Sequence, residues 1–267
     1  MNNPQKHENH HIHPDDPDML SVEIAQQKIL SRINRLEKEN ISIIKSTGYV
    51  LAEDIISNKN IPEFNNSAMD GFGVISNDTS NASKKNPIIL KILETIPAGK
   101  IPTNKLTQGN SVRIMTGSAI PEGCDAVIPF EYTNFPKINQ KKVKIYQQLT
   151  SGQNIRYIGE DIKENQKILS IGSTLNASNI GLIASLGIEY IKVFRKPLIS
   201  IISTGDELVS PGQKKKPGQI YDSNSYSIYS QVIQNGGIPD IKKIVPDNKK
   251  SLENAFLECS NSDLIIT

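Results

Sequence analysis

The sequence has no tryptophan, only two cysteines, and no histidine beyond residue 13. Cys124 and Cys259 are too few for a disulfide framework or a thiolate metal site, and we interpret both as small buried apolar residues. The missing histidines exclude Ser-His-Asp and Cys-His catalysis and histidine-ligated zinc hydrolysis in the folded part. Any chemistry must therefore use carboxylates, hydroxyls, Lys and Arg, backbone groups or a bound metal.

Long apolar runs and strong charge are also missing. No run approaches the ~20 residues of a membrane span, and the N-terminus lacks the apolar core of a signal peptide. We therefore expect a cytoplasmic protein that does not contact a membrane. The net charge is only +2 among 267 residues, which argues against nucleic acid as a partner. The basic triplet Lys214–Lys216 fits a solvated loop better than a phosphate contact.

The N-terminal segment 1–18 is polar, contains three prolines, and holds all four histidines: His7, His10, His11 and His13. Such a composition predicts a disordered tail. A histidine cluster of this kind can bind metal adventitiously, but a tail without fixed geometry is the better interpretation.

Residues 19–60 and 151–195 carry helical and mixed patterns, which we interpret as one discontinuous domain. A stripe of apolar residues from Val22 to Leu36, with Ser21 as N-cap, predicts a helix. The other elements expected here are listed in chain order: a strand at Ile41–Lys45, a helical stretch at Gly48–Ile56, a helix within Gly172–Gly187 capped by Ser178, and a strand at Tyr190–Phe194.

Residues 61–150 read as an all-β module inserted into that first domain. Short β-rich runs alternate with glycine and proline turns, and no long helical pattern interrupts them. The predicted strands are Ile88–Ile92, Ser111–Thr116, Ala126–Glu131 and Lys142–Tyr146.

Residues 196–267 show a β-α-β-α-β pattern, typical of the first half of an open parallel α/β sheet. The predicted strands are Leu198–Ser203, Ile241–Val245 and Asp263–Thr267; the predicted helices are Asn224–Asn235, with Asn224 as N-cap, and Lys250–Cys259. Three strands leave a sheet edge uncovered, so we expect the domain to be incomplete at Thr267. The fold class is thus multidomain α/β and β.

Four loops with carboxylates stand out. Asp70-Gly71, within 62–72, is typical of a hairpin turn when taken alone. Thr116-Gly117, at a predicted strand end, is open to close approach of a ligand. Glu160-Asp161 suits a hard cation or a solvated turn. The loops 203–208 and 217–224 follow the first strand of the α/β region, where ligands bind in open α/β sheets.

Taken together, these loops resemble the molybdopterin molybdenumtransferase family, which includes the E domain of gephyrin. The matching strings, in order, are Ser67-Ala-Met-Asp-Gly-Phe72, Arg113-Ile-Met-Thr-Gly117, Pro121-Glu-Gly-Cys-Asp-Ala-Val127, Arg156-Tyr-Ile-Gly-Glu-Asp161, Ser203-Thr-Gly-Asp-Glu-Leu208 and Pro217-Gly-Gln-Ile-Tyr-Asp-Ser-Asn224. Departures are mild: Ser118 and Gly73 replace common alanines, and Asn165 replaces a glycine. The family continues past Thr267 into further pterin- and molybdate-binding segments.

The resemblance implies a function and a set of site residues. The function is Mg²⁺-dependent insertion of molybdate into adenylylated molybdopterin, with release of AMP. The implied catalytic residues are Asp70, Thr116, Asp161 and Glu207, and Asp161 and Glu207 are the candidate metal ligands. The implied cofactor-binding residues are Thr204, Gly205, Asp206, Asp222, Ser223 and Asn224.

The resemblance also implies partners: a homodimer whose subunits share the active site, and the molybdopterin adenylyltransferase. Two alternatives stay open. One is a non-catalytic scaffold on the same fold, which would be expected to lose the acidic residues that this sequence keeps. The other is an inactive truncated remnant of the family.

Overall fold

The computed structural model describes residues 20–138 and 141–267, so the predicted tail lies outside the described residues. The chain forms two compact units. The described residues of the first unit are 20–41, 48–50 and 192–267; the second unit comprises 42–47 and 51–191. The subdivision into a discontinuous first domain and an inserted β domain stays a prediction.

A five-stranded mixed sheet, with the order β8-β5-β7-β6-β9, forms the body of the second unit. Its strands are β5 (Gly71–Val74), β6 (Ile88–Ile96), β7 (Asn110–Ile114), β8 (Ala126–Pro129) and β9 (Lys142–Ile145). Only β6 and β7 are parallel; the other neighbours are antiparallel. Four of these strands match the predicted ones within a few residues, and after β8 the segment Phe130–Tyr132 turns into a 3-10 helix.

The sequence did not predict the fifth strand, β5, because it contains two glycines, which are depleted in strands. The structure gives the reason for both. A Cβ on Gly71 would lie 2.0 Å from the carbonyl oxygen of Ile128, and one on Gly73 would lie 2.9 Å from the Val112 side chain. Close packing against the neighbouring strands therefore requires glycine in the middle of the sheet.

The other elements of the second unit are short. Two-stranded antiparallel ladders join β3 (Ile55–Ile56) to β11 (Lys167–Leu169) and β4 (Asn66–Ser67) to β10 (Ile155–Arg156). Helix α2 covers Ala177–Ser185. Its N-cap is Asn176, which forms a capping box with Asn179, so the prediction of Ser178 as the cap is wrong.

Two predictions near the start of the chain are also wrong. The segment 48–56 is not helical: Gly48 has a φ of +78°, and the short strands β2 (Val50–Leu51) and β3 follow it. The predicted strand Ile41–Lys45 is instead the end of β1 (Lys38–Ser42) followed by a 3-10 helix at Ile43–Lys45. Strand β12 (Tyr190–Phe194) is confirmed, and it lies between β1 and β2 in a three-stranded sheet.

Helix α1 (Val22–Leu30) has the predicted N-cap, since the Ser21 hydroxyl accepts a hydrogen bond from the Ile24 N–H at 3.3 Å. The helix ends at Leu30 rather than at Leu36. None of its residues is buried, and Ile33 beyond its end is also exposed. Because packing of an apolar face supplies most helical stability, an unburied stripe does not extend the helix.

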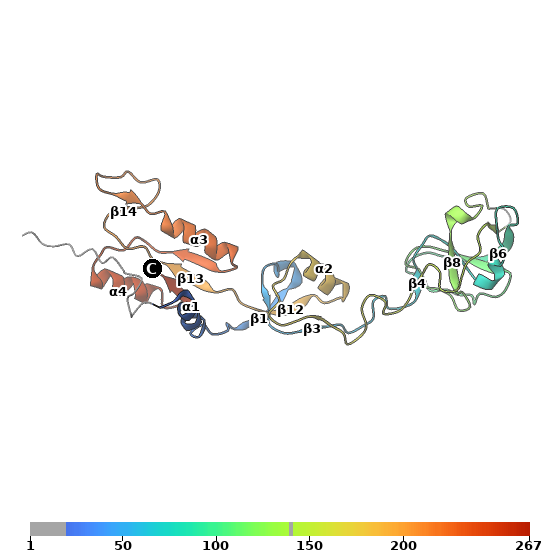
Figure 1. Ribbon diagram of the computed structural model, residues 1–267, viewed down its shortest axis with the longest axis horizontal. Helices are drawn as coiled ribbons and strands as arrows, with labels where there is room; N and C mark the ends of the chain where they lie inside the picture. Colours follow the sequence, from blue (N-terminus) through green and yellow to red (C-terminus); the bar gives the residue numbers. More distant parts are fainter. Residues whose placement is uncertain (1–19, 139–140) are drawn as a thin grey trace, which may run out of the picture. The chain divides into compact units, whose positions relative to one another are not determined.

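The first unit contains a parallel sheet with the order β16-β13-β17, flanked by two helices (Figure 1). Its elements are β13 (Leu198–Ile201), α3 (Asn224–Gln234), β16 (Ile238–Ile241), α4 (Lys249–Glu258) and β17 (Leu264–Ile266). The parallel pairing confirms the predicted β-α-β-α-β order. Among the described residues, no helix is long and apolar enough to cross a membrane.

Details of this sheet differ from the prediction. The second strand in chain order, β16, lies at 238–241 instead of the predicted 241–245. Val245 contributes only an isolated parallel bridge to Thr204. The N-caps are Ser223 for α3 and Asn248 for α4. The small parallel ladder of β14 (Leu208–Val209) with β15 (Ile220–Tyr221) had no signal strong enough to predict it, because each strand is only two residues long.

Candidate functional site

Asp70 and Thr116 are brought together by the pairing of β5 with β7. Asp70 precedes Gly71, which pairs with Ile114, so Asp70 and Thr116 lie at the same end of the ladder. The Thr116 N–H and hydroxyl both donate to Oδ1 of Asp70, at 2.7 and 2.8 Å. Both hydrogen bonds lower the pKa of Asp70, and the one from the Thr116 N–H has the larger effect. Asp70 is therefore a fixed carboxylate, and Thr116 orients it.

Asp161 forms an ion pair with Arg156, which stands five positions earlier in the same loop. Both side chains are about half-exposed, and the Asp161 N–H donates to the Ile61 carbonyl at 2.9 Å. The neighbouring Glu160 accepts the N–H of Tyr157 at 2.9 Å and closes its own turn. The adjacent acids thus have separate local partners. Arg156, which sequence analysis quoted but did not assign, belongs to the candidate site.

Backbone bonds join these loops to one another. The Ser67 N–H donates to the Ser118 carbonyl, and the Gly117 N–H donates back to the Ser67 carbonyl. The Ala68 N–H donates to the Asn154 carbonyl, just before β10. Three of the four predicted loops are therefore parts of one structure in the second unit.

The fourth predicted loop lies in the first unit, at the carboxyl ends of parallel strands. A cavity of about 240 Å³ opens where β13 and β17 end. Four predicted ligand residues line it: Thr204, Asp222, Ser223 and Asn224. This is the place where open α/β sheets bind ligands, as the sequence indicated.

Asp222 is the buried acid of this cavity, with a relative exposure of 5%. Burial would raise its pKa, but hydrogen bonds from the backbone and hydroxyl of Ser225, and from Ser203, hold the pKa below its usual value. The Ser225 N–H lies 3.1 Å from Oδ1. Asp222 therefore stays charged and fixes the first turn of α3, where negative charge is favourable.

Gly205 and Asp206 line a second cavity, of about 620 Å³. Three lysines share its wall: Lys214, Lys216 and Lys243. The sequence predicts a solvated loop for the triplet Lys214–Lys216; its residues are exposed, and two of them also line this cavity. Lys243 comes from the segment after β16, which only the tertiary structure brings here.

Glu207 is exposed and lies against Gly205. A Cβ on Gly205 would lie 2.7 Å from Oε2 of Glu207, and the φ of Gly205 is +147°, so only glycine fits. A further acid, Asp247, was not singled out in the sequence. Its N–H lies 3.4 Å from Oδ1 of Asp206. It follows the Thr204–Val245 bridge, a contact that the sequence spacing did not reveal.

No group of three or more His, Cys, Asp or Glu side chains within 20–138 and 141–267 is arranged to hold a metal ion. The described carboxylates are therefore separate donors rather than a preformed cage. The assignment of Asp161 and Glu207 to a metal stays a prediction.

Comparison with known families gives two matches. Residues 20–187 match the MoeA N-terminal region (domain I and II), and residues 200–267 match a probable molybdopterin binding domain. Together they cover both units described above.

Individual relatives agree. The chain is 34% identical over 251 residues to molybdopterin molybdenumtransferase 2 of Mycobacterium tuberculosis, covering 93% of this chain and 61% of that protein. It is 35% identical over 259 residues to the molybdopterin molybdenumtransferase of Haemophilus influenzae, covering 93% and 60%. The crystal structure of the molybdopterin biosynthesis MoeA protein of Pyrococcus horikoshii superposes with a TM-score of 0.79 at 32% identity, covering 90% of this chain and 63% of that one.

The chain thus spans less than two thirds of the length of these relatives. Over that span, both matched regions and the identities lead to one conclusion: the chain belongs to the molybdopterin molybdenumtransferase family.

Proposed function

We propose that this chain provides the anion-binding and carboxylate loops of an enzyme of molybdenum cofactor biosynthesis, which inserts molybdate into adenylylated molybdopterin and releases AMP. The observation that supports it is the cavity beside Gly205 and Asp206, walled by three lysines. Molybdate and the phosphates of the substrate are all anions. The three lysines outnumber Asp206, the one acid on the cavity wall, and a concave site with an excess of positive charge concentrates anions.

The neighbouring cavity at the ends of β13 and β17 suits the uncharged, hydrogen-bonding part of the substrate. Its walls offer hydroxyl and amide groups from Thr204, Ser223 and Asn224. These groups donate and accept hydrogen bonds, as a pterin edge requires. We assign the pterin to this cavity and the oxyanions to the lysine-walled one.

We propose that Mg²⁺ arrives bound to the phosphates of the substrate and is then also held by carboxylates of this chain. Mg²⁺ is commonly held by one or two carboxylates together with phosphate oxygens and water, not by an all-protein cage. The exposed carboxylate of Glu207 meets that requirement, and Asp161 is the second candidate. When bound, the ion would polarise the phosphoryl oxygen.

Asp70, Thr116, Arg156 and Asp161 form the second half of the proposed machinery. The Asp70 carboxylate, held by Thr116, is rigid enough to orient a water or a substrate hydroxyl. We propose that these residues act on substrate bound by the partner subunit of a homodimer. The molybdopterin adenylyltransferase is the proposed supplier of the substrate, in the cytoplasm.

The finer architecture that goes with this function is also a proposal. Residues 19–60 and 151–195 form the discontinuous first domain, 61–150 the inserted β domain, and 196–267 part of the molybdopterin-binding domain. The match of 20–187 to a region described as two domains supports this division.

Molybdate binding tests the proposal on the chain itself. Lys243→Gln and Lys216→Gln should each weaken molybdate binding about tenfold, because a hydrogen bond to a charged group is worth roughly 1.5–3 kcal/mol. Lys91→Gln, on the exposed face of β6, is the matched control and should bind normally. Equal affinity in all four proteins, measured by calorimetry, would contradict the assignment of this cavity.

A further inference from the structure

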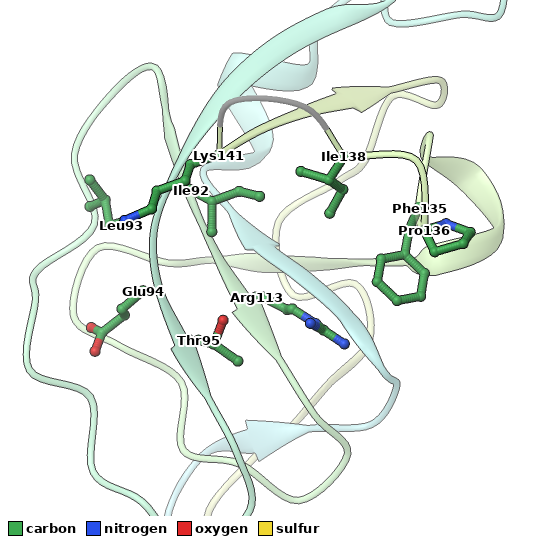
Figure 2. Close-up of a pocket in the computed structure, with 9 residues that line it drawn as sticks. All are labelled: Ile92, Leu93, Glu94, Thr95, Arg113, Phe135, Pro136, Ile138 and Lys141. Atoms are coloured by element: carbon green, nitrogen blue, oxygen red, sulfur yellow. The ribbon is translucent and has the colours of Figure 1, made fainter.

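A third cavity, of about 500 Å³, opens in the five-stranded sheet of the second unit, where β6 bulges (Figure 2). In the β6–β7 ladder Ile92 pairs with Ser111, but the next pair is Thr95 with Arg113. One extra residue on β6 therefore separates the two pairs. Bulges of this kind redirect side chains and are common beside binding sites.

Arg113 occupies a position that the sheet otherwise gives to core residues. Arg113 on β7 pairs with Phe72 on β5, and Phe72 in turn pairs with Ile128 on β8. Phe72 and Ile128 are both 0% exposed. Arg113 thus places a permanent cation in the same row of the sheet as two fully buried apolar side chains, directly beside Phe72.

The guanidinium of Arg113 has aromatic neighbours. Its Cζ lies 4.9 Å from the ring centroid of Phe135 and 5.5 Å from that of Phe130. The two rings stack, with centroids 4.1 Å apart. Stacking of this kind offsets part of the cost of removing a cation from water, but it leaves the N–H groups at the edge of the guanidinium unused.

Among the described residues, one of these N–H groups is buried and has no acceptor. Nε of Arg113 is buried without a hydrogen-bond partner, and within the described ranges the side chain forms no ion pair. A buried donor left unpaired destabilises the fold, and more so when the group is charged, so native structures rarely keep one without a reason. A ligand that supplies an acceptor would remove that cost.

The charges around the cavity also favour an anion. Glu94 is the one acid on its wall, and its carboxylate already accepts hydrogen bonds from Thr103 and Asn104. Figure 2 shows the carboxylate of Glu94 and the guanidinium of Arg113 pointing away from each other. Lys141 adds a second cation to the wall. Ile92, Phe135 and Ile138 supply apolar surface.

We propose that this cavity is a binding site for a small organic anion: the carboxylate or phosphate accepts hydrogen bonds from Arg113, and an apolar or aromatic body lies against Ile92, Phe135 and Ile138. The site uses none of the residues assigned to molybdate insertion, so this proposal can be tested independently of the proposed function.

The first experiment titrates the native chain with benzoate, phenyl phosphate and neutral benzamide, following the Nε–H resonance of Arg113 by NMR. Both anions should move this resonance in a saturable way, and benzamide, which has a similar shape but no charge, should not. Inorganic phosphate, which lacks the apolar body, should bind at least about tenfold more weakly than phenyl phosphate, since burial of a ring contributes over 1.4 kcal/mol. No saturable shift with either anion, or an equal shift with benzamide, overturns the proposal.

The second experiment uses variants. Arg113→Met keeps the length and the apolar stem but removes the donors, and should lower the affinity for benzoate about ten- to a hundredfold. Arg113→Lys keeps the charge without the planar fork and should lower it less. Arg35→Met, in the other unit, is the control and should bind normally. If Arg113→Met fails to fold, Lys141→Gln should still weaken binding severalfold. Native-like affinity in whichever of these two cavity variants is folded contradicts the proposal.

Discussion

The mixed five-stranded sheet and the parallel sheet with its helices bury their side chains to different extents. In the mixed sheet of the second unit, Phe72, Val112 and Ile128 on three neighbouring strands are all 0% exposed. In the parallel sheet of the first unit and its helices, Phe256 is 41% exposed and Leu257 71%. Because buried apolar area contributes about 25 cal/mol per Å², we expect a substitution in the core of the mixed sheet to cost more stability than one at these helix positions. Cavities occur in both regions: two lie beside the parallel sheet and one opens where β6 of the mixed sheet bulges.

The proposed catalytic carboxylates also differ between the two units. In the second unit Asp70 and Asp161 are each held by a side-chain partner, Thr116 and Arg156. In the first unit Glu207 is exposed and, among the described residues, its carboxylate accepts no hydrogen bond. Two of the proposed catalytic acids, Asp70 and Asp161, are thus fixed before a ligand arrives, whereas the third, Glu207, is free to bind a ligand or an ion.

The largest expected effect tests the difference in packing. Phe72→Ala should lower the free energy of unfolding of its unit by about 3–5 kcal/mol, because it leaves a cavity in a closed core. The matched change Phe256→Ala removes a side chain that is already partly in water, and should cost less than about 2 kcal/mol. Urea unfolding of both variants measures this. Equal losses would show that the two regions are packed equally well.

A smaller effect is expected at the helix caps. Asn176 caps α2 in the second unit and Asn248 caps α4 in the first. Replacing either by alanine should cost about 1 kcal/mol, since a backbone N–H loses its acceptor. Asn176→Ala should cost more because it also breaks a reciprocal capping box. Thermal unfolding followed by circular dichroism distinguishes the two; a larger loss for Asn248→Ala would reverse the expected order.

The smallest effect concerns acid stability of the first unit. Hydrogen bonds from Arg195 lower the pKa of Asp263, and a hydrogen bond from the Leu198 N–H lowers it further. Burial acts in the opposite direction but does not outweigh them. A lowered folded pKa stabilises the fold above the unfolded value of about 3.9, and this stability is lost as pH falls through the folded pKa. Asp263→Asn keeps an acceptor for Leu198 and loses the ion pair. The native chain should therefore lose its advantage over this variant below about pH 4; a constant difference down to pH 2 would contradict the linkage.

Much of the fold follows from local sequence patterns. Short β-rich runs between glycine and proline turns predicted four strands of the mixed sheet, and the continuous apolar run at 198–203 predicted β13. Strand β5 was missed because its glycines are explained only by the neighbours that pack against them. The segment 48–56 was misread as helical because two short strands separated by a turn can imitate a helical spacing.

The candidate site was predicted one loop at a time. The ordered strings found Asp70 and Thr116, but their hydrogen bond depends on the β5–β7 register, which a single sequence does not specify. The role of Lys243 depends on a segment more than 25 residues away from Lys216 in sequence, and it emerged only from the cavity that they share. The residue types were visible in the sequence, but which distant segments pair with one another was not, and that pairing builds the site.

The most direct test of the account is AMP release from adenylylated molybdopterin in the presence of molybdate and Mg²⁺. It is best measured on a version of this chain completed to the length of its relatives, with the unsubstituted version confirmed as active. Glu207→Gln and Asp161→Asn should each lower the rate by about 10²–10⁴-fold, the usual cost of losing a catalytic acid or base, without a change in melting temperature. Lys91→Gln should release AMP at the native rate. Near-native release by both carboxylate variants would contradict the proposed function of these loops.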